Sequence, residues 1–161
     1  MIFRKATTFC VLLLGSLVAA TNFACDKDDD DDDVTPEPVV YTLSGEATGT
    51  QEVPSFTTTA TGNLTGTYNA DNNIMNFSIT WTGLSSAPSA MHFHGPASPG
   101  VNASVLIPIT GFTAAAAGSV TGSDTLTSAE EGFLFAGKLY YNIHTPAKPG
   151  GEIRGQVVTF R

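Results

Sequence analysis

Charged side chains are scarce in most of this chain. They make up 14% of its 161 residues, whereas about a quarter is usual for soluble domains. From residue 41 onward there are seven acidic and four basic side chains. Nucleic-acid binding needs a basic surface that neutralises phosphates, so nucleic acid is excluded as a partner.

Cysteine is scarcer still. Cys10 and Cys25 are the only two, and both precede the segment with β-strand patterning. That segment therefore has neither a disulfide framework nor a cysteine metal site. It also lacks a Gly-rich loop opening a helix and a G-x-S-x-G nucleophile elbow, which argues against nucleotide binding and serine hydrolysis.

The longest apolar stretch is Ala6–Ala20, which follows a basic start. Its 15 residues are too few to span a membrane comfortably, so residues 1–24 are predicted to be a secretory signal peptide. Ala24 directly before Cys25 is typical of a lipoprotein cleavage site, which predicts lipidation of Cys25. Asn22 stands where such sites usually carry Leu, and ordinary secretion is the alternative.

An acidic tether is expected over residues 25–39. It holds eight of the chain's 15 acids, six of them in the unbroken run Asp28–Asp33. Like charges in sequence repel one another and stay extended. The cysteine–x–Lys–acidic pattern resembles the signal that places some Gram-negative lipoproteins on the outer face of the outer membrane. We therefore expect a cell-envelope lipoprotein at the cell surface, held to the membrane through its lipid alone; a solubilising linker is the alternative.

Residues 40–161 are predicted to form one β domain. Residues 74–81 alternate strictly between apolar and polar side chains, the pattern of a half-buried strand. With the run 60–68 and the Asn-rich turn between them they predict a β-hairpin. Further strands are expected at 40–45, 90–94, 104–109, 118–126, 138–145 and 152–160, with one short helix from Ser128, the expected N-cap, to Ala136. The predicted fold is all-β: a single antiparallel β-sandwich or barrel, immunoglobulin-like or superoxide-dismutase-like.

All three histidines lie in two Pro- and Gly-flanked stretches. In a strand, residues i and i+2 point to the same face, so His92 and His94 project together. The same spacing gives a second polar row with Asn142 and His144, and a third with Glu152, Arg154 and Gln156. If the three strands are neighbours, these rows merge into one polar patch.

Three imidazoles on one patch are suitable ligands for copper or zinc. A fourth protein ligand is missing unless Glu152 or another acid supplies it. The alternative is structural: the histidines hydrogen-bond nearby backbone, and Glu152 forms an ordinary ion pair with Arg154.

The stretch from Leu43 to Val157 resembles the CHRD domain, a module named after chordin. The matching segments are L-S-G-E at 43–46, Q-E-V-P at 51–54, H-F-H-G-P-A at 92–97, G-K-L-Y-Y-N-I-H-T at 137–145 and P-G-G-E-I-R-G-Q at 149–156. The resemblance implies an all-β, immunoglobulin-like or barrel domain without a settled biochemical activity. A fainter resemblance to copper–zinc superoxide dismutase rests on the His-aromatic-His-Gly stretch. That enzyme needs more histidines than the three present here, so its activity is not expected.

Two hypotheses follow. The first is a non-enzymatic, surface-anchored binding or structural module whose partner is an unidentified protein or small ligand. The second is an exported copper- or zinc-binding protein, carrier or redox, with His92, His94 and His144 as its ligands.

Overall fold

Nine antiparallel strands form one continuous sheet in the computed structural model, which describes residues 36–161. The strands pair in the order β5-β4-β7-β8-β1-β2-β3-β6, and β9 pairs with β1. Their bounds are β1 Val40–Thr48, β2 Thr61–Asn69, β3 Ile74–Thr82, β4 Ala90–His94, β5 Val105–Pro108, β6 Gly118–Thr125, β7 Tyr140–Thr145, β8 Lys148–Gln156 and β9 Val158–Phe160, with a 3-10 turn η1 at Gly49–Gln51 and the helix α1 at Ser128–Phe135. The predicted all-β class is therefore confirmed, including its single short helix.

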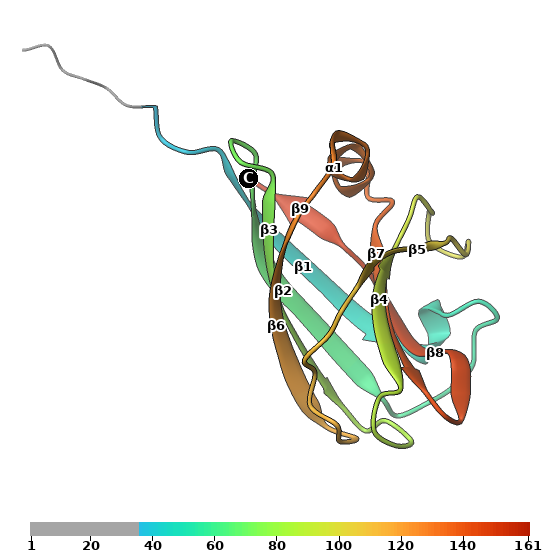
Figure 1. Ribbon diagram of the computed structural model, residues 1–161. Helices are drawn as coiled ribbons and strands as arrows, with labels where there is room; N and C mark the ends of the chain where they lie inside the picture. The colour runs from blue at the N-terminus through green and yellow to red at the C-terminus, as the bar shows by residue number, and fades with distance from the viewer. Residues whose placement is uncertain (1–35) are drawn as a thin grey trace, which may run out of the picture. The chain divides into compact units, whose positions relative to one another are not determined.

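The sheet curls on itself, so that strands far apart in its order face each other (Figure 1). The rings of Phe77 in β3 and Phe93 in β4 meet edge to face across the interior, with centroids 5.0 Å apart. Both belong to one hydrophobic cluster that also contains Met91, Tyr141 and Ile143. The alternation predicted for residues 74–81 is confirmed, because Met75, Phe77, Ile79 and Trp81 are all buried.

The predicted hairpin is β2 and β3, paired residue for residue from Thr61–Thr82 to Asn69–Ile74. The turn between them contains Asn73 at φ 60°, the left-handed conformation that Asn tolerates better than most residues.

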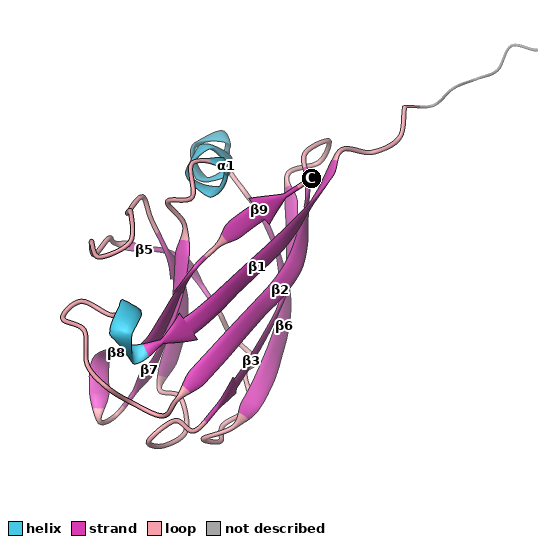
Figure 2. Cartoon of the chain, turned by 180° about the vertical axis from the view of Figure 1, so that it is seen from behind, coloured by secondary structure: helices cyan, strands magenta, loops and turns pink. Residues whose placement is uncertain are grey.

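The predicted strand 152–160 is two strands. Val157 separates them, and its N–H donates to the carbonyl of Leu139, 2.9 Å away, outside either ladder. Before Val157 the chain pairs with β7 as β8, and after it the chain pairs with β1 as β9 (Figure 2). The buried Val157 side chain anchors this change of partner.

The helix α1 begins one residue earlier than expected, because its N-cap is Thr127 and not Ser128. The backbone N–H of Glu130 donates to Thr127 Oγ1 over 3.3 Å, and the N–H of Thr127 donates to the Glu130 carboxylate over 2.8 Å. This reciprocal pair is a capping box, which satisfies two otherwise unpaired donors.

Thr127→Ala is therefore expected to destabilise the domain by about 1 kcal/mol, the usual cost of a lost N-cap. Ser128→Ala, one residue further on, is expected to change stability little because Ser128 caps nothing. Urea denaturation of both variants checks this. Equal losses in the two variants, or a larger loss for Ser128→Ala, would contradict the assignment of the cap.

The predicted signal peptide, the lipidated Cys25 and the acidic run lie outside the described residues, and these assignments stay predictions. Within residues 36–161 no helix is both long and apolar enough to cross a membrane.

Candidate metal centre

The three polar rows expected from the sequence lie side by side on the sheet. Strand β7 lies between β4 and β8, and its register sets Asn142 opposite both His92 and Arg154. Directly opposed residues point to the same face of a sheet. His92, Asn142 and Arg154 therefore share one face of the sheet, away from the core side chains Met91 and Ile143.

This polar face is not an open patch, since loops cover much of it. Asn142 and Arg154 are at most 3% exposed, and His94 is 7% exposed. Asn102, in the loop after β4, donates from Nδ2 to the carbonyl of Val53 in the loop after η1. The alternation of side chains along a strand predicts which residues share a face, but it does not predict the loops that cover that face, because loops have no periodicity.

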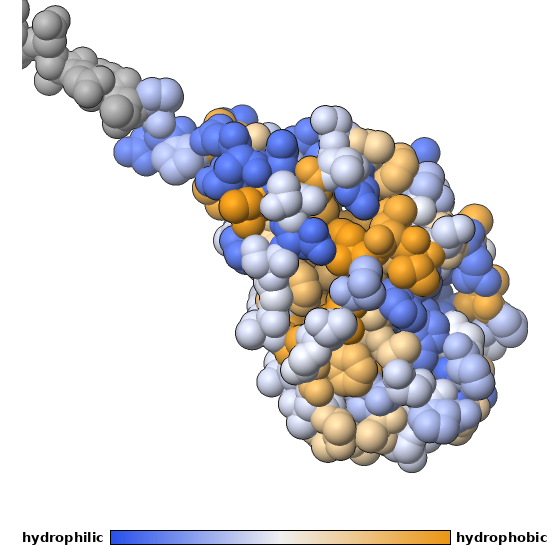
Figure 3. Space-filling view, in the orientation of Figure 1, coloured by the Kyte–Doolittle hydropathy of each residue, from blue (hydrophilic) through white to orange (hydrophobic). Residues whose placement is uncertain are grey.

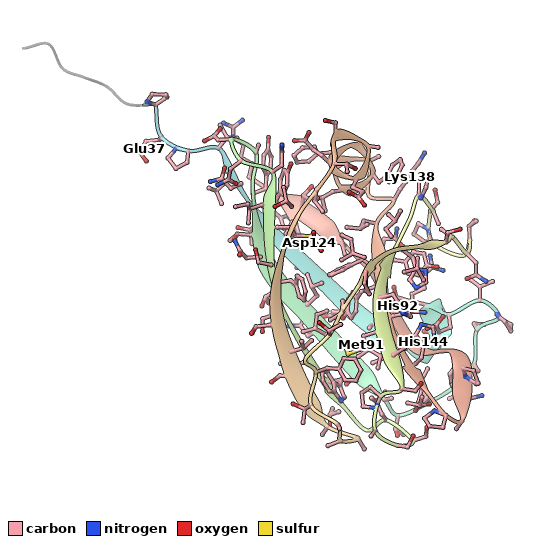
Figure 4. The ribbon with its side chains drawn as sticks, viewed as in Figure 1. Glu37, Met91, His92, Asp124, Lys138 and His144 are labelled. Atoms are coloured by element: carbon pink, nitrogen blue, oxygen red, sulfur yellow. The ribbon has the colours of Figure 1, made fainter. Side chains whose placement is uncertain are left out.

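The imidazoles of His92, His94 and His144 form one cluster, with one ligand nitrogen of each within 4.8 Å of the others. Figure 4 shows His92 and His144 next to each other on β4 and β7. Nδ1 of His92 is 3.1 Å from Nε2 of His144. Two nitrogens bound tetrahedrally at about 2.0–2.1 Å from one zinc ion are roughly 3.3 Å apart. These two nitrogens already lie near that distance.

The hydrogen bonds of His144 orient its metal-facing nitrogen. Nδ1 of His144 is 2.9 Å from the carbonyl oxygen of Pro149. A carbonyl only accepts, so Nδ1 carries the proton and Nε2 presents a lone pair toward His92. A histidine metal ligand typically has this arrangement, with its other ring nitrogen donating to a backbone carbonyl or carboxylate.

Burial and neighbouring imidazoles keep His92 and His144 neutral. Burial lowers the pKa of His92, and the nearby His144 and His94 lower it further. Burial also lowers the pKa of His144, against the opposing effect of the hydrogen bond that its ring donates to the Pro149 carbonyl. A metal binds only neutral imidazole. Both rings are therefore neutral at neutral pH, and the ring proton of His92 has to move from Nδ1, which donates to His144, to Nε2 before Nδ1 can bind a metal.

His94 is held more firmly than the other two. Nδ1 of its ring lies 3.1 Å from the carbonyl oxygen of Ala103, and Nε2 lies 2.9 Å from Oδ1 of Asn142. Its ring stacks on that of Tyr140, with centroids 4.8 Å apart and planes 3° from parallel. The guanidinium of Arg154 lies 3.4 Å from the centre of the same Tyr140 ring. Stacking on Tyr140 thus links His94 on β4 to Arg154 on β8.

Glu152 and Arg154 do not pair as the structural alternative expected. The Glu152 carboxylate accepts hydrogen bonds from the N–H and the hydroxyl of Ser85 and from the hydroxyl of Thr145, at 2.8, 2.6 and 2.6 Å. These three donors use both of its oxygens. Glu152 is also outside the histidine cluster, so it supplies no fourth ligand.

The acid facing Arg154 is Glu52, which sequence reasoning missed. Burial raises the pKa of Glu52 to about 7, against the attraction of Arg154. A Cβ on Gly151, at φ +124°, would lie 2.2 Å from Glu52 Oε1, so the close approach of Glu52 requires glycine there. The available signal was the Q-E-V-P segment, but nothing in its spacing placed it beside the histidines.

The space-filling view shows hydrophilic surface over this part of the molecule, below an apolar area (Figure 3). His92 and His144 are only half-buried. The cluster is therefore accessible from solvent on the side of these two rings, while His94 forms its buried side.

Comparison with known proteins gives one result. No curated protein and no solved structure matched the chain. The CHRD domain family matched residues 43–157, a span that contains the whole histidine cluster, its covering loops, seven complete strands of the sheet and most of β1. The chain belongs to the CHRD domain family.

Proposed function

We propose that this protein is a surface-anchored lipoprotein whose CHRD domain is a non-enzymatic module that binds one copper or zinc ion. The observation that carries the proposal is the convergence of His92, His94 and His144, the only histidines of the chain, into one cluster. Imidazole nitrogen suits both ions, and copper binds such sites more tightly than zinc.

The contacts of the rings favour binding over catalysis. Within residues 36–161 the histidine nitrogens hydrogen-bond backbone carbonyls, the Asn142 amide and one another. They contact no serine or threonine hydroxyl in that part of the chain. A histidine that activates a nucleophile must lie within hydrogen-bond distance of it.

Metal binding requires a small rearrangement of His94. The largest separation in the cluster, 4.8 Å, exceeds the roughly 3.3 Å of a tetrahedral pair. The Nε2 of His94 also faces Asn142 Oδ1. Rotation of the ring exchanges that hydrogen bond for a bond to the metal and brings the third nitrogen toward the other two.

Equilibrium dialysis of the chain with Cys25→Ser against Zn²⁺ or Cu²⁺ tests this proposal. We expect one equivalent to be retained and the melting temperature to rise with free metal, because a ligand of the native state stabilises by mass action. Mg²⁺, which prefers oxygen ligands, is the control and should not be retained. Loss of both Zn²⁺ and Cu²⁺ on dialysis, with unchanged melting, would remove metal binding from the proposal.

The anchor is tested separately. Cys25→Ser is expected to move the protein from the membrane fraction of cells to the soluble fraction, because the thiol that takes the lipid is gone. Fractionation followed by immunoblotting measures this. A variant that stays with the membranes would show that Cys25 is not the anchor.

Deletion of the acidic run tests whether the protein is exposed at the cell surface. Deleting Asp28–Asp33 is expected to leave the protein in the membrane fraction but protect it from protease added to intact cells. Unchanged digestion of the shortened protein would refute the role of the run as an export signal.

A further inference from the structure

The outer face of β1, β2, β3 and β6 is an array of uncharged polar side chains. The register of these strands sets their outward residues in rows, one residue from each strand. One row is Glu46, Asn63, Thr80 and Ser119, and the next is Ser44, Thr65, Ser78 and Thr121. Figure 2 shows these strands side by side on the side of the molecule turned to the viewer.

Four such rows contain fifteen residues, none of them fully buried: Thr48, Thr61, Thr82; Glu46, Asn63, Thr80, Ser119; Ser44, Thr65, Ser78, Thr121; Thr42, Thr67, Asn76, Ser123. Fourteen carry a hydroxyl or an amide, and Glu46 alone carries a charge. β-branched threonine suits an exposed strand, but strand propensity alone does not explain a solvent-facing surface without a single Lys or Arg.

This face is hollowed at one end. A cleft of about 530 Å³ lies over the row that starts with Thr48 and the row that starts with Glu46. Its lining includes the polar side chains of Thr61, Asn63 and Thr80 and the largely buried Trp81. Its volume is within the range of small-ligand sites, about 300–1,000 Å³. The one carboxylate of the face lies in this cleft.

The chemistry of the face excludes most partners. Nucleic acid and anionic membranes need cations, which the face lacks. Protein interfaces are enriched in exposed aromatic, Met and Arg side chains and depleted in Ser, the reverse of this composition. Hydroxyls and amides both donate and accept hydrogen bonds, so the complementary partner is uncharged and itself rich in hydroxyls.

We propose that the cleft over β1, β2 and β3 binds a neutral polysaccharide. The hydroxyls of Thr61 and Thr80 and the amide of Asn63 exchange hydrogen bonds with sugar hydroxyls. The carboxylate of Glu46 accepts from two neighbouring hydroxyls of one sugar. The site is separate from the histidine cluster and does not depend on metal binding.

Affinity electrophoresis of the chain with Cys25→Ser, through gels containing dextran, galactomannan or mixed-linkage β-glucan, tests this site. We expect at least one of these polymers to retard the protein, and heparin, a charged polymer, not to do so. The single variants Thr80→Lys and Glu46→Gln should each raise the dissociation constant for the polymer about tenfold and so reduce the retardation. A tenfold change is equivalent to the loss of one or two good hydrogen bonds. Thr67→Lys, on the same face outside the cleft, is the matched control and should bind as the parent does.

Unchanged melting temperatures show that the variants are folded, as expected for exposed positions. Migration of the parent unaffected by all three neutral polymers overturns the proposal, as does full binding by both Thr80→Lys and Glu46→Gln. A dimer that Thr80→Lys dissociates in sedimentation experiments, without retardation by any polymer, would assign the face to a second copy of the chain. Retained polysaccharide binding by His144→Ala is expected, because the two sites are separate.

Discussion

Replacing His144 with alanine is expected to weaken Zn²⁺ and Cu²⁺ binding by more than about 100-fold, because losing even an outer-sphere partner of a metal ligand costs about 10–100-fold. His144 contributes more than an outer-sphere partner. Its Nε2 is the nitrogen that faces His92 at 3.1 Å, and the carbonyl of Pro149 orients it from behind. Without it, two imidazoles remain.

Competition with a chromophoric chelator measures this change in affinity. Asp124→Ala is the control, since Asp124 lies on β6, well away from His92 and His144 (Figure 4). It removes an acidic side chain, a possible source of adventitious binding, without touching the cluster. Equal affinity of His144→Ala and the parent would show that any bound metal lies elsewhere.

Replacing Glu152 with glutamine is expected to destabilise the domain by about 3 kcal/mol at neutral pH, because hydrogen bonds to a buried charged group contribute about 1.5–3 kcal/mol each. Glu152 is 2% exposed, and its three hydrogen bonds come from Ser85 and Thr145. Glutamine keeps the shape of the side chain, but it offers one acceptor oxygen and an amide nitrogen that only donates. Some of the three donors then lose their partner.

This stabilisation should depend on pH in a defined direction. Burial acts to raise the pKa of Glu152, but the hydrogen bonds from Ser85 and Thr145 outweigh it, so the pKa is lowered from 4.5. A carboxyl whose pKa is lower in the folded state stabilises that state above its unfolded pKa, and the effect is lost as the pH falls through the folded pKa. The difference between parent and Glu152→Gln should therefore be full at pH 7 and shrink below about pH 4.5.

Guanidinium denaturation at several pH values measures that difference. Glu46→Gln replaces an exposed carboxyl on β1 and is expected to change stability by less than about 0.5 kcal/mol at every pH. A constant difference for Glu152→Gln between pH 7 and pH 3 would mean that its charge is not the source of the stability.

The alternation of side chains made much of the site predictable. The apolar partners Met91, Phe93 and Ile143 determine which way His92, His94 and His144 point, and burial of those partners confirms it. Tyr140 lies on the same face as Asn142 and could have been included by the same rule. Its stacking against His94 could not, because stacking depends on rotamers and not on spacing.

The alternation of side chains along the strands did not predict the partners of the charged groups Glu152 and Arg154. Glu152 bonds Ser85, 67 residues away in a loop, and Arg154 faces Glu52, which follows η1. Both partners lie in segments without a period, whose position is determined only once the sheet has curled. The i, i+2 spacing of Glu152 and Arg154 suggested an ion pair by proximity alone, whereas in the structure each has its own partners and Nη2 of Arg154 remains buried without a hydrogen bond.

The X-ray absorption spectrum of the Cys25→Ser chain loaded with one equivalent of zinc tests the central claim most directly. The account predicts three imidazole nitrogens at about 2.0–2.1 Å from the metal, and a spectrum that loses imidazole scattering in His144→Ala. A first shell of oxygen alone, or one that is the same in the parent and in His144→Ala, would contradict it.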